Sequence, residues 1–357
     1  NFGNNIDDGN ILFENCSSTG DISNYAGGIS GARTGKSMSN TSSIIFKNCY
    51  STGDINNNWD KSGGISGMKT GSKMNNSSIT FNECYSTGYI GSDSGGISGN
   101  DTGGEMNNSS SITFNDCYST GNIGKEAGGI SGRSTGNSMN NSSIELNNCY
   151  SEGTIGLNAG GISGFYIGHK MIGSTITVKN CHSKGAIDTH GGGIFGAHIG
   201  FEMTNNSTNS STITANNCYS TGTIDSYAGG ISGSYTGYKM KNNSLIELNN
   251  CYSTGVIGNY AGGISGFQTG YELDSSNVTA NNCYTIGSIG TNAGGIYGFN
   301  SDSSATHSNC IYTNGKSVDI TVPVTQTANT WEDQNAFITI GTNSVDTDGS
   351  TILNEIT

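Results

Sequence analysis

A column of tyrosines offers the most extensive binding chemistry in this sequence. Ten cysteines recur along the chain, and in most repeats the residue directly after the cysteine is aromatic. If the cysteine side chain points into a core, the next side chain points outward, because successive residues of a strand face opposite sides. The outward rings then form a stripe that could stack on sugars or on another protomer. The stripe comprises Tyr50, Tyr85, Tyr118, Tyr150, Tyr219, Tyr252 and Tyr284. The alternative is that the rings only stabilise an outer face by stacking on each other.

The cysteines could bind a metal or form disulfides, but their spacing favours a structural role. The sequence has no Cys-x-x-Cys pair, and ten cysteines in 357 residues are too few for a disulfide scaffold. Equivalent side chains in stacked layers would lie about 4.8 Å apart, beyond the ~3.5–4.5 Å that a disulfide prefers between its Cβ atoms. A disulfide between the terminal coils stays open as an alternative. We therefore expect reduced, space-filling thiols in a core ladder of Cys49, Cys84, Cys117, Cys149, Cys181, Cys218, Cys251 and Cys283.

Two groups of titratable residues could act in acid–base or metal chemistry. Glu83 and Asp116 interrupt a column of asparagines that precedes the cysteines, and paired carboxylates are the machinery of glycosidases. The more economical interpretation is a corner where stacked amides hydrogen-bond to each other and to the turn backbone, with these two carboxylates solvated or partly protonated. Four of the five histidines fall in one stretch but at different positions of the repeat, so they need not converge: His169, His182, His190 and His198. The sequence therefore favours no catalytic residue, metal or cofactor.

Glycosylation is a further candidate modification. Sequons of the Asn-x-Ser/Thr type recur between the Met or Leu position and the next strand, and glycans one coil apart would collide, so we expect only some to be occupied in a glycosylating compartment. The candidates are Asn40, Asn76, Asn108, Asn141, Asn206 and Asn277.

These columns of equivalent residues arise from an internal repeat in the sequence. Successive cysteines are 33, 35, 33, 32, 32, 37, 33, 32 and 27 residues apart, and a Gly-Gly-Ile element follows each of the first nine. Ile or Val stands five residues before these cysteines and Phe or an aliphatic residue three before, a period of two that predicts a strand with one face in a core. Ankyrin and tetratricopeptide arrays share this repeat length, but Gly, Asn, Ser and Thr are poor helix formers.

The arithmetic predicts an all-β fold, a parallel β-solenoid (right-handed β-helix) with three faces per coil and about ten coils of about 33 residues. We expect an N-terminal segment or cap over residues 1–10, solenoid repeats over 11–299, and an irregular last coil with a C-terminal cap or assembly segment over 300–357. Because a solenoid ends in open strand edges, we also expect a homo-oligomer that grows head to tail into a filament.

Charge and hydropathy narrow the range of partners. Fourteen Lys and Arg face 27 Asp and Glu, and the formal net charge of −13 disfavours nucleic acid. The apolar runs are only a handful of residues long, which predicts no membrane insertion. A low-charge, Lys-poor repeat composition fits an extracellular location, with a carbohydrate or a cell surface as the partner.

The repeat core, Asn-Cys-Tyr-Ser-Thr-Gly-x-Ile followed by Ala-Gly-Gly-Ile-Ser-Gly, resembles the GLUG-type repeats over roughly residues 11–299. Ile-Ser replaces the usual Leu-Val, as in 128–132. Such repeats occur in secreted adhesins, in surface proteases of the IgA-cleaving kind and in large viral or microbial surface proteins. The chain has no His-Glu-x-x-His motif, so the protease activity does not carry over. The resemblance implies a non-enzymatic structural or adhesive fibre at a cell or virion surface. The alternatives are a polysaccharide-active enzyme and a carbohydrate-binding module on a β-helix.

Overall fold

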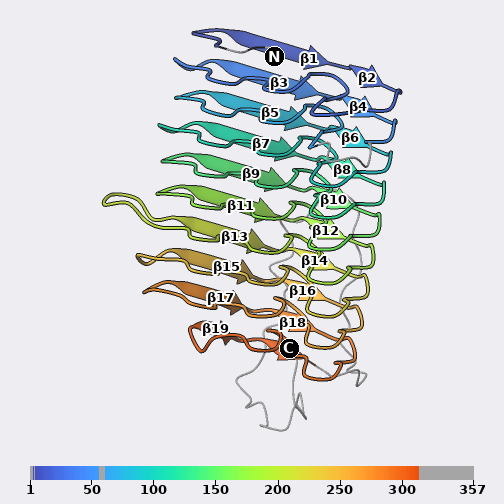
Figure 1. The fold of residues 1–357 in the computed structure, drawn as a ribbon, viewed down its shortest axis with the longest axis vertical. Helices are drawn as coiled ribbons and strands as arrows, with labels where there is room; N and C mark the ends of the chain where they lie inside the picture. The colour runs from blue at the N-terminus through green and yellow to red at the C-terminus, as the bar shows by residue number, and fades with distance from the viewer. Residues whose placement is uncertain (1–2, 4, 56–60, 313–357) are drawn as a thin grey trace, which may run out of the picture.

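The predicted parallel β-solenoid is confirmed. The computed structural model describes residues 3, 5–55 and 61–312, and within them the chain forms strands, bridges and turns but no helix. The chain climbs one coil per repeat, so equivalent strands lie directly above one another along the long axis of the molecule (Figure 1).

Two parallel ten-stranded sheets run the length of the stack. The first consists of the longer strands β1 (Asn10–Glu14), β3 (Ser43–Lys47), β5 (Ser78–Asn82), β7 (Ser111–Asn115), β9 (Ser143–Asn147), β11 (Thr175–Lys179), β13 (Thr212–Asn216), β15 (Leu245–Asn249), β17 (Asn277–Asn281) and β19 (Ala305–Ser308). The second consists of two-residue strands that begin directly after each cysteine: β2 (Ser17–Ser18), β4 (Tyr50–Ser51), β6 (Tyr85–Ser86), β8 (Tyr118–Ser119), β10 (Tyr150–Ser151), β12 (His182–Ser183), β14 (Tyr219–Ser220), β16 (Tyr252–Ser253), β18 (Tyr284–Thr285) and β20 (Ile311–Tyr312).

The strand register pairs each residue with the equivalent residue of the next coil. Ile11 pairs with Ile44 and Phe13 with Phe46 between β1 and β3, and the same columns continue through the sheet. The rest of each coil has no named strand and is joined to its neighbours by single parallel bridges, such as Gly27 to Gly63. In the part of the chain that the structure describes, the tenth layer contributes only β19 and β20, so the complete coils are slightly fewer than the ten expected.

Each coil encloses two apolar cores. The larger core stacks the Ile, Phe, Cys and Met columns, of which Ile44, Phe46, Cys49 and Met74 are fully buried. The smaller core stacks the isoleucine that stands six residues after each cysteine, for example Ile55. Burial of one such side chain contributes roughly 1.5–3 kcal/mol, and only the neighbouring layers can provide it.

A glycine–serine seam runs between the two cores. A Cβ atom added to Gly64 would collide with the carbonyl oxygen of Gly96 and would lie 2.9 Å from Oγ of Ser51. Only glycine leaves room for this approach of backbone to backbone. The Gly-Gly pair of each repeat is therefore a packing requirement.

The core changes composition along the stack. Phe13, Phe46, Phe81 and Phe114 form parallel stacks with ring centroids 4.7–4.8 Å apart. The column then narrows to Leu146, Val178 and Ala215. In the layer of Val178, buried Phe195 replaces the serine of both adjacent layers. Buried Ile167 and Ile199, in the layers of Leu146 and Val178, occupy a position where most repeats have Thr. Where the side chains of the phenylalanine column become smaller, larger side chains from the opposite wall fill the space, as close packing requires.

The asparagine before each cysteine occupies a left-handed turn. Asn48 has φ 53° and Asn180 has φ 54°, a region that Asn tolerates better than most residues. Its amide also joins a ladder: Nδ2 of Asn180 donates to Oδ1 of Asn148 at 3.2 Å. The left-handed backbone conformation and the side-chain hydrogen bonds together explain why asparagine recurs at the position before the cysteine.

The ends of the repeat region are only partly closed. Asp7 in the expected cap over 1–10 forms a bridge with Ser39, while Ile11 and Phe13 stay half-exposed. At the other end the stack continues into β19 and β20, beyond the expected repeat limit of 299. The remainder of the expected C-terminal cap, 313–357, lies outside the described residues.

The close backbone stacking predicts a sharp contrast between two glycines of the column that lies four residues after each cysteine. A Cβ at Gly121 would overlap the carbonyl oxygen of Gly88, whereas a Cβ at Gly20 meets nothing within 4 Å. Gly121→Ala should therefore lower the free energy of unfolding by about 3 kcal/mol or more. Gly20→Ala should change the free energy of unfolding by less than about 1 kcal/mol. Thermal melts followed by far-ultraviolet circular dichroism measure both; equal melting temperatures would contradict the close stacking.

Candidate functional site

The tyrosine stripe is a continuous ring stack. All seven predicted tyrosines lie at the first position of successive two-residue strands, and His182 fills the gap between Tyr150 and Tyr219. Neighbouring ring centroids are 4.7–5.2 Å apart with planes within 8° of each other. Parallel strand pairing places each ring directly above the equivalent ring of the neighbouring coil, one coil rise away. The rings therefore stack face to face.

Stacking determines what this stripe can offer a ligand. Both faces of an internal ring such as Tyr118 are covered by its neighbours, so a sugar can reach ring edges and hydroxyls but not a free ring face. Burial raises the pKa of Tyr118 and Tyr150, and that of Tyr284 to about 12. These three phenols therefore remain neutral hydrogen-bond donors at physiological pH.

The cysteine ladder lies inside the larger core. All ten cysteines are free thiols; the eight of the predicted ladder are fully buried, and Cys16 and Cys310 are partly exposed. Each thiol lies against backbone carbonyls: Sγ of Cys117 is 3.3 Å from the oxygen of Asn115 and 3.6 Å from that of Phe81 in the coil before. Burial raises the pKa of Cys117 and of Cys181, so these two thiols stay protonated.

Glu83 and Asp116 do not lie in a groove. Both are exposed and occupy the left-handed turn of the asparagine column, with φ 55° and 54°. Oδ1 of Asp116 accepts a hydrogen bond from Nδ2 of Asn148 at 3.0 Å. Asp116 thus continues the amide ladder as an acceptor.

The four clustered histidines separate into three environments. His182 belongs to the tyrosine stack, and His190 stacks on Tyr227. His169 and His198 share a surface with Tyr166, each ring about 5 Å from it (5.2 and 5.1 Å). Burial lowers the pKa of His198, and of His182, to about 4. No group of three or more side chains suited to a metal occurs among the described residues.

A further candidate surface is not evident from the spacing of the cysteines. The fourth residue after Gly-Gly-Ile in most repeats has φ between 54° and 62° and projects from a corner of its coil. We call this the corner column; it comprises Arg33, Lys69, Asp101, Ser134, Tyr166, His198, Tyr235, Gln268 and Asn300. Alignment of the repeats on Gly-Gly-Ile instead of on cysteine would have revealed it.

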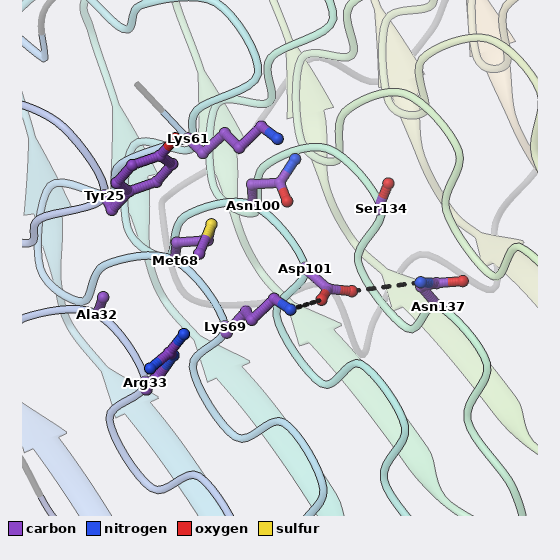
Figure 2. A pocket seen from close by; sticks show the side chains of 10 residues that line it. All are labelled: Tyr25, Ala32, Arg33, Lys61, Met68, Lys69, Asn100, Asp101, Ser134 and Asn137. Carbon is purple, nitrogen blue, oxygen red and sulfur yellow. Dashed lines mark hydrogen bonds and ion pairs between the residues drawn. The ribbon is translucent and has the colours of Figure 1, made fainter. Parts of the chain in front are cut away.

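The corner column changes chemistry halfway along the rod. In the fifth to seventh coils, counted from β1, its residues Tyr166, His198 and Tyr235 belong to an aromatic cluster in which Phe201 also stacks on Tyr238 at 5.2 Å. In the first four coils it is polar and charged, and it lines an open groove of about 670 Å³ (Figure 2). Arg133 marks the boundary: its guanidinium lies 5.2 Å from the Phe165 ring centroid and pairs with Glu126 at 2.6 Å.

The predicted sequons differ in accessibility. Asn40, Asn76, Asn108 and Asn277 are exposed, whereas Asn141 and Asn206 are half-buried. Nδ2 of Asn206, the atom that a glycan would modify, donates to Oδ1 of Asn141 at 2.8 Å. Nδ2 of Asn40 and of Asn108 also donate, to Asp7 and Asn75. Glycan attachment at these three positions would replace a ladder hydrogen bond.

Thiol exposure is directly measurable. The native chain should react with a thiol reagent such as Ellman's at no more than two positions, Cys16 and Cys310, because the other eight thiols are fully buried. In denaturant all ten should react. Rapid native reaction of more than two thiols would contradict the buried ladder.

His182 generates a prediction about acid stability. Its pKa of about 4 in the fold lies below the ordinary value of about 6.5, so the unfolded chain binds the proton first and stability falls as pH drops from about 6.5 to about 4. His182→Tyr keeps an aromatic ring in the stack and removes this loss of up to about 3 kcal/mol. Melting temperatures at pH 7 and pH 4.5 should show a smaller acid-induced decrease for the variant; equal decreases would contradict the burial of a neutral ring.

Comparisons with known proteins identify no relative. No protein-family model matches the chain, no curated protein matches it, and no solved structure matches it. No helix long and apolar enough to cross a membrane occurs in the described residues.

Proposed function

We propose that this chain is a non-enzymatic structural and adhesive rod of the GLUG-like kind, exposed at a cell or virion surface. The observation that carries the proposal is the like-on-like register of two ten-stranded parallel sheets, which makes a rod of repeated surface columns. With coils about 4.8 Å apart, ten layers extend on the order of 48 Å. Such a rod presents the same side chain many times at a fixed interval, as multivalent attachment requires.

We further propose that the rods join end to end. Ser43 N donates to the oxygen of Gly9 and Asn15 N to that of Lys47, so Gly9 and Asn15 direct their backbone toward β3. Since alternate residues of a parallel strand bond to opposite neighbours, Asn10, Leu12 and Glu14 direct theirs away from the stack.

The outer side of β19 likewise lacks a partner strand within the described residues. Addition of β1 of a second copy to β19 of the first would continue the parallel register and cover the half-exposed Ile11 and Phe13. A head-to-tail contact of this kind does not close on itself, so it produces a filament.

A proline in the edge strand tests the assembly. Leu12 is 57% exposed, and its N–H points outward, so Leu12→Pro removes a donor for the second copy without breaking a bond inside the coil. Sedimentation and electron microscopy of the full chain should show concentration-dependent filaments, with association at least about tenfold weaker in Leu12→Pro. Leu12→Thr, which keeps the N–H, is the matched control. Monodisperse wild-type rods at all concentrations would contradict the assembly.

A carbohydrate-binding module on the same fold is the second candidate function. The observation that favours it is the groove on the first four coils, where cations, amides and an exposed tyrosine lie together (Figure 2).

A further inference from the structure

The groove on the first four coils is built on rigid backbone. Lys69 N donates to the oxygen of Asn100 at 2.8 Å, and Arg33 N donates to that of Met68 at 2.7 Å. Arg33, Lys69 and Asp101 all hold the left-handed corner conformation, with φ 59–62°. Their side chains therefore project from fixed points one coil apart, and little backbone ordering is needed when a ligand binds.

The groove concentrates positive charge in an acidic chain. Arg33, Lys61 and Lys69 line it, while the whole sequence has only 14 Lys and Arg and a net charge of −13. Among the described residues, no carboxylate lies within 4.0 Å of the Arg33 guanidinium or of the Lys61 ammonium group, and Lys69 is 3.7 Å from Asp101. Elsewhere on this side of the rod Arg133 is neutralised by two carboxylates.

Uncharged groups complete the lining. Tyr25 is 47% exposed, and no other aromatic ring of the described residues stacks on it, unlike the rings of the tyrosine stripe. Asn100 is 8% exposed, and Asn137 donates to Asp101 at 3.5 Å. In Figure 2 the Tyr25 ring and the Lys61 side chain lie together at one end of the groove, with Asn100 beside them. An exposed aromatic ring, amides, and cations that have no carboxylate within 4.0 Å among the described residues are groups that recognise a sugar bearing a carboxylate.

We propose that this groove binds a terminal acidic sugar, a sialic or uronic acid, at the end of an otherwise neutral glycan. Arg33 holds the carboxylate in a bidentate pair, and Lys61, at the opposite end of the groove beside Tyr25, adds to the positive potential of the groove. Tyr25 packs against the sugar ring, and Asn100 bonds its hydroxyls. A long polyanion is disfavoured, because the chain's overall negative charge repels it beyond the groove.

The test titrates the full chain with 3′-sialyllactose and with lactose as the neutral control. Sialyllactose should bind at least about tenfold more tightly than lactose, and the double variant Arg33→Gln/Lys61→Gln should remove that difference. Tyr25→Ser should weaken both sugars. The matched control is Lys179→Gln, which removes one exposed charge on β11, far along the rod, and should leave binding unchanged.

Three results would overturn this inference: equal affinity for the two sugars, an unchanged affinity in the double variant whose circular dichroism is native, or tighter binding to heparin than to sialyllactose. The inference does not depend on end-to-end assembly. Leu12→Pro should therefore bind sialyllactose as the wild type does, which separates failure of the groove from failure of the filament.

Discussion

The close parallel stacking of backbone on backbone is the constraint on which the rest of this structure depends. Each coil lies against the next through bridges such as Gly63 to Gly95, and a Cβ at several glycines would overlap a carbonyl of the adjacent layer. Along the axis, a side chain at one level then meets its own equivalent above and below. Columns of one residue type follow from this geometry: isoleucine and phenylalanine inside, asparagine at left-handed corners, and tyrosine outside.

The same constraint decides which surfaces are available to a partner. A column that repeats an aromatic residue in every layer uses the ring faces for internal stacking, as the 4.9 Å separation of Tyr85 and Tyr118 shows. Ligand chemistry is therefore better served where the repeat diverges. At the corner column the backbone is constant but the side chains change from charged to aromatic, and the groove lies in the charged part.

The proposed rod and the proposed groove use different parts of the fold. Assembly depends on the terminal layers, where β1 has no strand beyond it among the described residues and core side chains are half-exposed. Sugar binding depends on a few side chains on the wall of the first four coils. A filament would repeat that groove once per protomer and so convert a weak contact into avid attachment. The two proposals are compatible without requiring one another.

Much of the fold followed from the sequence alone, because identical residues at a 33-residue interval can bury their apolar faces only against their own copies. The columns of Ile, Phe, Cys and Tyr, their inward or outward direction and the all-β class were readable from spacing. Three features required the tertiary structure: the division of each coil into two cores by the glycine–serine seam, the mutual coverage of the tyrosine rings, and the meeting of Tyr25, Arg33 and Lys61 in one groove. The repeat period determines what stacks along the axis. It leaves open which residues meet around the circumference of a coil, because that depends on where each turn directs the chain.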